Sequence, residues 1–517
     1  MKITILSTSD THGFIPPTNF VNLHENMPFG LEKAAFIIDQ YKKHHPNEKI
    51  ITIDNGDFLE GSPLSDFIAA SDNEFVKQAY AAAYNAVDYD FGTIGNHEFD
   101  YGMDYLQAYI QASDRQFLCA NLVDQNDQPL LGKPYQIVDM NGLKVAFLGL
   151  TTTSSRKWKF IKNLKNFNLK SAVQTAKALM PEIKQQADVV IGIYHGGFER
   201  DINGNWNDIT VGENEGYELL QSIPEIDALV TGHQHRKIAT KLFDRPTIQP
   251  GYRGQFVGKI SLDIDPITKQ VQHSDAQLID VEKAFLDPKV YAIITPIVSE
   301  LNQWLDNPVA IIDGDLTFRN AFDARVQETA YIELIQKIQM DKMGVDVSAT
   351  AVYNNEAHGF ENPITMRNII TNYVYPNTLV VSQISGKDLR EALETSAQYF
   401  AEENGNLIIN PEFLFPKHRF YNYDMYEGIE YDLDISRPIG QRVTKLKYHD
   451  KDVLDEDQLK VALNKYRALG GGHYGMFTKD KIIHEDNTPI QQIIFEYLQK
   501  NPLIIATCNN NFKIYTD

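Results

Sequence analysis

The chain opens with MKITILSTSDTHG (residues 1–13), in which an apolar, β-branched run leads directly into a short polar turn. Residues 2–9 have the composition of a buried strand, and Asp10 and His12 follow where that strand should end. Four more polar clusters follow strand-like runs or lie in turns next to them: residues 54–57 (DNGD), 95–98 (GNHE), 194–196 (YHG) and 232–235 (GHQH). In open α/β sheets, ligands gather beyond the carboxyl ends of the strands. The recurrence predicts an α/β fold whose loops converge on one site.

The rest of the first half alternates short apolar runs with helix-like segments, a pattern typical of βαβ units. Residues 31–42 are expected to form a helix, because Leu31, Ala34 and Ile38 fall on one face. Further strands are expected at residues 50–53, 145–150, 189–194 and 228–230. The N-terminal domain is therefore predicted to be α/β.

A second domain is expected because 517 residues exceed the size of one ordinary core. Apolar residues recur at helical spacing over residues 288–305, although Pro296 should kink or interrupt that helix. Strand-like and helix-like runs then alternate again to the end of the chain. We divide the chain into an N-terminal domain (1–285), a linker helix (286–310) and a C-terminal α/β domain (311–517).

The composition of the chain argues against several classes of binding partner. A net charge of −21 argues against duplex nucleic acid, which is held mainly by Lys and Arg. No stretch approaches the roughly 20 apolar residues of a membrane span, so we expect no membrane partner. Cys119 and Cys508 are the only cysteines, which leaves no disulfide framework and no Cys-based zinc motif. If Met1 is the native start, the protein is expected to be cytoplasmic, whereas a trimmed chain could be secreted or surface-anchored.

The polar clusters supply oxygen and nitrogen donors of the kind that bind divalent metal ions. The candidate ligands are Asp10, His12, Asp57, Asn96, His195, His233 and His235. Seven ligands are too many for one tetrahedral ion but suit two ions about 3.5–4 Å apart, with Asp57 as the bridging carboxylate. Imidazole favours Mn, Zn, Fe or Co over Mg or Ca. Two dications outweigh the charges of Asp10 and Asp57, so such a site would attract a phosphoester.

Each cluster alone is also typical of an ordinary turn or a helix cap. It is the combination, in order and after successive strands, that favours metal binding. His97 and Asp100 lie three residues apart after Asn96, so in a helical turn they would share a face. Asp100 could then orient His97, which could stabilise the phosphoryl oxygens or donate a proton to the departing alkoxide.

These motifs resemble those of the calcineurin-like metallophosphoesterases, and within them the bacterial 5'-nucleotidase and 2',3'-cyclic-nucleotide phosphodiesterase family. The resemblance implies a four-layer α/β/β/α N-terminal domain joined by a linker helix to a C-terminal nucleotide-binding domain. It implies that one ion takes Asp10, His12, Asp57 and His235, and that the other takes Asp57, Asn96, His195 and His233. It also implies that His97 and Asp100 form the catalytic dyad.

The second half is similar to the 2',3'-cyclic-nucleotide 2'-phosphodiesterase/3'-nucleotidase branch at residues 373–378, 421–424 and 464–472. By that resemblance Tyr375 and Tyr466 would sandwich the base. The other substrate-binding candidates are Asn377, Gly470, Gly471 and Gly472. With 26 tyrosines in the chain, core packing is the alternative for the two tyrosines, and a plain flexible turn is the alternative for the glycines.

One departure from the family bears on the substrate. The 5'-nucleotidase branch has an acidic residue that holds the ribose where this chain has Gly472. We therefore expect a small nucleotide as the partner, with hydrolysis of 2',3'-cyclic nucleotides and 3'-nucleotides as the leading hypothesis. A 5'-nucleotidase or nucleotide-sugar hydrolase is the alternative enzyme, and a nucleotide-binding, metal-stabilised scaffold is the alternative without catalysis.

Overall fold

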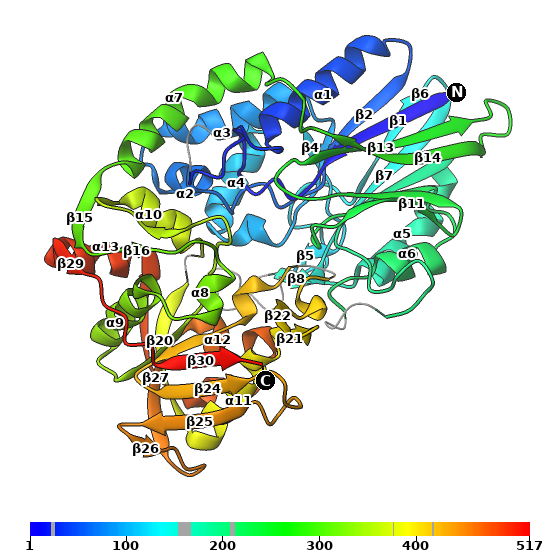
Figure 1. Ribbon diagram of the computed structural model, residues 1–517. Coiled ribbons are helices and arrows are strands. Elements are labelled where there is room, and N and C mark those ends of the chain that lie inside the picture. The colour runs from blue at the N-terminus through cyan, green and yellow to red at the C-terminus, as the bar shows by residue number, and fades with distance from the viewer. Residues whose placement is uncertain (22–25, 154–166, 207–211, 376, 416–417, 517) are drawn as a thin grey trace. The chain divides into compact units, whose positions relative to one another are not determined.

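The computed structural model describes residues 1–21, 26–153, 167–206, 212–375, 377–415 and 418–516 (Figure 1). Pro376, within one of the segments that carry the family resemblance, lies outside them. The chain divides into two compact units, Met1–Leu301 and Asn302–Asp517. Among the described residues, no helix combines the length and apolar character that crossing a membrane requires.

The first unit is built on two six-stranded sheets. The first has the order β14 (Val271–Asp280), β13 (Phe256–Ile264), β1 (Lys2–Thr8), β2 (Lys49–Asp54), β3 (Phe91–Gly92), β4 (Gln116–Phe117). The second has the order β11 (Lys237–Leu242), β12 (Arg245–Pro250), β10 (Ala228–Val230), β9 (Val189–His195), β7 (Leu143–Thr151), β6 (Tyr135–Met140). The strands expected from the sequence are confirmed, with boundaries within two residues.

Parallel pairing at the centre of each sheet brings the predicted loops to one edge. β1 pairs in parallel with β2, with Thr8 opposite Asp54. β9 pairs in parallel with both β7 and β10. Apolar side chains of both sheets, such as Ile5 and Ile191, share one buried cluster. The central strands are buried on both faces, which explains why they are continuously apolar in sequence.

Helices cover the outer faces of the two sheets, which completes the expected four-layer α/β/β/α arrangement (Figure 1). The helices are α1 (Leu31–His44), α2 (Pro63–Ala70), α3 (Glu74–Val87), α4 (Met103–Ala112), α5 (Ala172–Gln186), α6 (Gly216–Ser222). The apolar face predicted for α1 is buried, with Leu31, Ala34 and Ile38 fully covered. A short two-stranded sheet pairs β5 (Leu122–Asp124) with β8 (Phe167–Leu169).

The helix α7 (Pro288–Leu305) continues through Pro296, so the interruption expected there is not observed. Proline removes one hydrogen bond from a helix but need not end it when the remaining turns are packed. Val290, Ile294 and Leu301 form a fully buried stripe along α7. The boundary between the compact units falls within this helix, after Leu301.

The second unit is also α/β, with one large apolar core. Its five-stranded sheet has the order β23 (Met425–Glu427), β17 (Val347–Thr350), β27 (Gln458–Asn464), β20 (Thr378–Ser385), β28 (Ile482–Pro489). A four-stranded sheet has the order β26 (Lys451–Asp452), β25 (Val443–Tyr448), β24 (Glu430–Asp434), β30 (Phe512–Tyr515). A three-stranded sheet has the order β19 (Ile364–Thr365), β15 (Pro308–Asp313), β29 (Leu503–Ile505).

Smaller pairs and helices complete this unit. β16 (Leu316–Thr317) pairs with β18 (Gly359–Phe360), and β21 (Phe400–Glu403) pairs with β22 (Asn406–Ile409). The helices are α8 (Asp323–Val326), α9 (Ala330–Met343), α10 (Met366–Asn372), α11 (Gly386–Ala397), α12 (Lys465–Ala468), α13 (Ile490–Lys500).

Candidate metal centre

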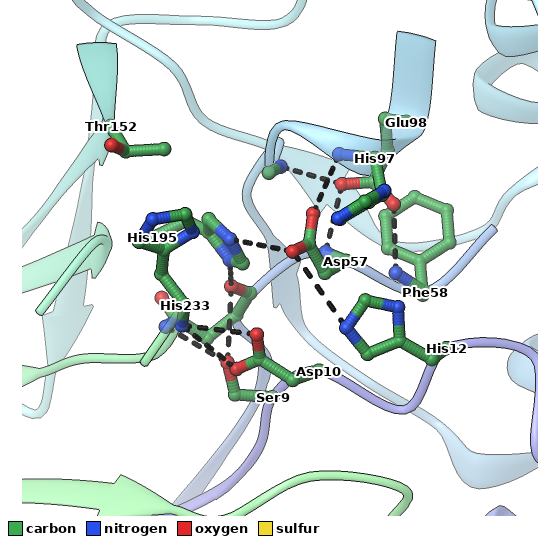
Figure 2. A network of polar contacts seen from close by, with 12 residues as sticks. Ser9, Asp10, His12, Asp57, Phe58, His97, Glu98, Thr152, His195 and His233 are labelled. Carbon is green, nitrogen blue, oxygen red and sulfur yellow. Dashed lines mark hydrogen bonds and ion pairs between the residues drawn. The ribbon is translucent and has the colours of Figure 1, made fainter. Parts of the chain in front are cut away.

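The seven candidate ligands lie at the carboxyl ends of the central strands of the first unit, or in the loops that follow them. Asp10 and His12 follow β1, and Asp57 follows β2. Asn96 follows β3, His195 ends β9, and the pair His233 and His235 follows β10. The side chains of Asp10, His12, Asp57, His195 and His233 turn toward one region between these loops (Figure 2).

Six of these side chains form two groups, and within each group the ligand atoms lie within 4.8 Å of one another. One group is Asp10, His12 and His235, and the other is Asp57, His195 and His233. Oδ2 of Asp57 lies 3.1 Å from Nε2 of His195 and 3.9 Å from Nε2 of His12. Asp57 therefore reaches both groups, as a bridging carboxylate must. This division of the residues matches the one that the family resemblance implies.

Two observations show that these residues suit divalent cations. Nε2 of His12 and Nε2 of His235 lie 3.0 Å apart, so the two nitrogens point at nearly the same place. Oδ1 of Asn96 is buried and has no hydrogen-bond partner among the described residues. A buried amide oxygen without a partner costs free energy, which a cation in contact with it would offset.

Backbone carbonyls fix the orientation of two ligand rings. Nδ1 of His12 lies 2.8 Å from the carbonyl of Glu60, and Nδ1 of His195 lies 2.6 Å from the carbonyl of Asn55. In its neutral form each ring therefore carries its proton on Nδ1, which leaves the lone pair of Nε2 for a metal ion. Nε2 of His233 lies 2.8 Å from Oε1 of Glu213.

The ligand loops hold most of the ligands in the left-handed backbone region. Positive φ values occur at Asp10, His12, Asp57, His233 and His235. That conformation costs roughly 1–3 kcal/mol for a residue other than glycine. Neighbouring glycines allow close packing around the strained loops: a Cβ on Gly95 would lie 2.2 Å from Oδ1 of Asp57.

The buried carboxylate of Glu98 organises the loop that carries Asp57 (Figure 2). It accepts hydrogen bonds from the backbone N–H groups of residues 57, 58, 59 and 95, at 2.8, 2.7, 3.1 and 2.6 Å. Burial and the negative charge of Asp57 raise the pKa of Glu98 to about 7. Glu98 thereby links two loops that each provide a proposed ligand.

His97 begins the short 3₁₀ turn His97–Phe99, and its Nδ1 lies 2.7 Å from Oδ2 of Asp100. The contact expected from their spacing is therefore present. The backbone N–H of His97 donates to Oδ1 of Asp57 at 2.8 Å, which joins the dyad to the bridging ligand. Burial would lower the pKa of His97, but the charges of Asp57 and Asp100 outweigh it and raise that pKa well above its ordinary value.

The second unit places three tyrosines in one cluster. Tyr375 and Tyr466 are 39% and 46% exposed, so neither packs in the core. The ring of Tyr421 meets both rings nearly at right angles, with centroids 6.2 Å from Tyr375 and 6.4 Å from Tyr466. Tyr421 begins the segment 421–424 that carries part of the family resemblance, but nothing in the sequence marked it as a substrate-binding residue.

The glycine loop beside Tyr466 is constrained rather than open. Gly470 and Gly472 have φ of +85° and +70°, and a Cβ on Gly471 would lie 2.5 Å from the ring of Tyr466. The buried guanidinium of Arg467 supports the loop by donating to the carbonyl of Gly471. These contacts favour a loop of defined shape over a plain flexible turn.

Asn377 lies just before β20. Its carbonyl accepts a hydrogen bond from the backbone N–H of Ile490 at 2.9 Å. This bond leads to α13 and not to the tyrosine cluster. Among the described residues, we find no hydrogen bond between Asn377 and Tyr375, Tyr421 or Tyr466. The structure thus brings Tyr466 and its glycine loop together, but shows no such link for Asn377.

Comparisons with known proteins agree with this architecture. Residues 3–237 match the calcineurin-like phosphoesterase family, and residues 308–479 match the 5'-nucleotidase C-terminal domain family. A crystal structure of a Staphylococcus aureus protein assigned as a 5'-nucleotidase is 33% identical, with a TM-score of 0.91 and complete coverage of both chains.

Two curated relatives extend the comparison. The 2',3'-cyclic-nucleotide 2'-phosphodiesterase/3'-nucleotidase of Haemophilus influenzae is 25% identical over 96% of this chain and 84% of its own. The trifunctional nucleotide phosphoesterase of Bacillus subtilis is 25% identical over 99% of this chain, which spans 39% of that longer protein. The chain therefore belongs to the calcineurin-like phosphoesterases that carry a 5'-nucleotidase C-terminal domain, and it is a phosphoric ester hydrolase.

Proposed function

We propose that the protein hydrolyses 2',3'-cyclic nucleotides to 3'-nucleotides, and those to nucleosides, at a centre of two divalent cations. The observation that carries the proposal is the arrangement of donors in two groups that share Asp57. The imidazole-rich donor set favours Mn, Zn, Fe or Co. The named activity of the Haemophilus influenzae relative supports the choice of substrate.

The seven candidate ligands would hold the cations, which when bound supply a water of lowered pKa and positive charge for the phosphate. The protein provides the geometry around them. Asp100 holds Nδ1 of His97, so Nε2 is the ring nitrogen available to a phosphoryl oxygen or a departing alkoxide. Without a cation, the charges of Asp57 and Asp100 raise the pKa of His97, which favours the protonated ring.

In the second unit, Tyr375 and Tyr466 are partly exposed side chains whose rings could stack on a base. Stacking on an aromatic face is worth about 1–3 kcal/mol per base and tolerates different bases. We therefore expect broad base specificity. The absence of an acidic side chain at Gly472 supports cyclic and 3'-nucleotides over 5'-nucleotides.

The test is a substrate panel with the metal-loaded protein. We expect higher kcat/KM on 2',3'-cyclic AMP and 3'-AMP than on 5'-AMP, and about two metal ions per chain by elemental analysis. A clear preference for 5'-AMP would instead establish a 5'-nucleotidase, the alternative that the Staphylococcus aureus structure favours. No turnover on any of the three would support a binding scaffold.

A further inference from the structure

Glu60 touches two histidines of the centre through different atoms. It lies in the turn between β2 and α2, and its side chain is mostly buried, at 10% exposure. Its backbone carbonyl lies 2.8 Å from Nδ1 of His12. Its carboxylate Oε2 lies 3.1 Å from Nδ1 of His97. One residue therefore contacts both a proposed ligand and the proposed catalytic histidine.

Glu60 and Asp100 both contact His97, at the same ring nitrogen. Oδ2 of Asp100 and Oε2 of Glu60 lie 2.7 Å and 3.1 Å from the same nitrogen. The contact with Glu60 is an ion pair beside the hydrogen bond to Asp100, and two contacts restrict the rotation of the ring more than one does. The rings of His12 and His97 meet edge to face, with centroids 5.1 Å apart.

The local structure holds Glu60 in place. Gly61 has a φ of +129°, and a Cβ there would lie 2.8 Å from Cβ of His12, so the chain passes close against that ligand. Ser62 then caps α2 through a reciprocal hydrogen-bond pair with Ser65. The turn thus enters a capped helix at once, which limits its freedom to move.

A second contact fixes α2 against the turn that carries the dyad. The hydroxyl of Tyr101, the residue after Asp100, donates to Oδ1 of Asp66 in α2 at 2.5 Å. The segment with Glu60 and the segment with His97 are therefore joined by a second contact besides the one at the imidazole. A chance surface contact would not be supported in this way.

We propose that Glu60 is a positioning residue for His97: together with Asp100 it aligns the imidazole so that Nε2 faces the phosphoryl group. Through its carbonyl it also fixes the ring of His12, so that the catalytic histidine and one metal ligand share an anchor. The inference rests on the role proposed above for His97, and not on which nucleotide is the substrate. Glu60, His97 and Asp100 also lie close enough to bind a cation themselves. The experiment below distinguishes a positioning role of Glu60 from such a ligand role.

The experiment compares E60A, E60Q, H97A and the double variant E60A/H97A, with activity measured on 2',3'-cyclic AMP and on p-nitrophenyl phosphate. We expect E60A to lower kcat about tenfold, as loss of a supporting contact does, with KM within about twofold and metal content unchanged. E60Q keeps an acceptor oxygen of the same shape and should recover most of the loss. In the H97A background, E60A should cost nothing further, because Glu60 acts through His97.

E48A serves as the matched control. The carboxylate of Glu48 bonds to Lys2 and Thr4 at the amino end of β2, away from the ligand loops, so activity should not change. An equal loss from E60A in the wild-type and H97A backgrounds, or a loss of bound metal, would overturn the proposal in favour of a structural or ligand role. If E60A is unstable, as shown by its Tm, E60M and E60M/H97A replace it in the same comparison, because methionine keeps the length of the side chain without an acceptor oxygen.

The experiment distinguishes failure of the role proposed for His97 from failure of the role proposed for Glu60. Unchanged turnover in H97A would remove the role of His97 and this inference with it. A slow H97A beside fully active E60A and E60Q would overturn this inference alone.

Discussion

At the scale of single residues, Glu98 satisfies four backbone N–H groups from two ligand loops. We predict that Glu98→Ala lowers the free energy of unfolding by about 3 kcal/mol or more, because several buried donors lose their partner at once. Metal content should fall with it, since Asp57 and Asn96 lie in the affected loops. Thermal unfolding and elemental analysis measure the two effects. Normal stability in Glu98→Ala would contradict this account, and E48A again provides the comparison.

We predict that metal uptake depends on pH through His195, a candidate ligand. Burial lowers its pKa, but the charge and hydrogen bond of Asp57 outweigh burial and raise the pKa to about 9 in the absence of a cation. A ligand imidazole must lose that proton, so apparent metal affinity should rise with pH up to about 9, by as much as tenfold per unit from this group alone. Titration of the metal-free protein at pH 7, 8 and 9 tests this, and constant affinity would refute it.

The same group predicts the opposite trend for the stability of the metal-free protein. A histidine whose folded pKa is raised stabilises the fold fully below its unfolded value of about 6.5. That contribution is lost as pH rises through the folded value of about 9. The metal-free protein should therefore lose stability over the range in which it gains metal affinity.

The sequence could single out the seven candidate ligands because most of them follow a strand whose apolar pattern is visible. Asn96 is the exception, since it follows the two-residue strand β3, which is too short to show such a pattern. The sequence could also predict the contact of His97 with Asp100, which depends only on local spacing. The roles of Glu98 and Glu213 could not be predicted. Glu98 bonds to backbone groups about 40 residues away, and Glu213 reaches His233 from a different loop. Backbone donors carry no signal in the sequence of side chains.

At the scale of elements, the buried strands were the most predictable part, because continuous apolar runs bounded by polar turns fix both ends. β10 has the boundaries that its sequence predicts. The helix α7 was harder, since Pro296 is a local breaker whose effect is overridden by the buried stripe along the same helix. Local propensity is a weak guide where tertiary packing opposes it.

The glycine loop after α12, residues 470–472, allows the preference between 3'- and 5'-nucleotides to be tested by substitution. A Cβ on Gly472 would lie 2.1 Å from Oδ1 of Asn422, and its φ is +70°. We predict that Gly472→Asp does not create a 5'-nucleotidase; it should raise KM for every nucleotide while leaving kcat on p-nitrophenyl phosphate unchanged. Gly475→Ala is the matched control, because its Cβ would meet nothing within 4 Å. A gain of activity on 5'-AMP would show that the loop accepts an acidic side chain.

At the scale of the whole molecule, the two units contain different sets of candidate site residues. The metal donors and His97 all belong to Met1–Leu301, and the tyrosine cluster belongs to Asn302–Asp517. The two family matches fall on the same sides of this boundary. The chain has a net charge of −21, whereas the proposed centre of two cations would be positive only locally. Because salt screens distant surface charges, this arrangement is consistent with a small anionic substrate.

This separation predicts that substrate affinity and metal chemistry can be altered independently. Removing a stacking face costs about 1–3 kcal/mol, so Tyr466→Ala should raise KM for nucleotides by roughly 5- to 150-fold. Hydrolysis of p-nitrophenyl phosphate and the metal content should stay at wild-type levels, because the ligands lie in the other unit. Tyr515→Ala removes a tyrosine of similar exposure, 37%, outside the cluster and serves as the control. Equal losses on p-nitrophenyl phosphate and nucleotides would mean that Tyr466 supports the fold rather than the base.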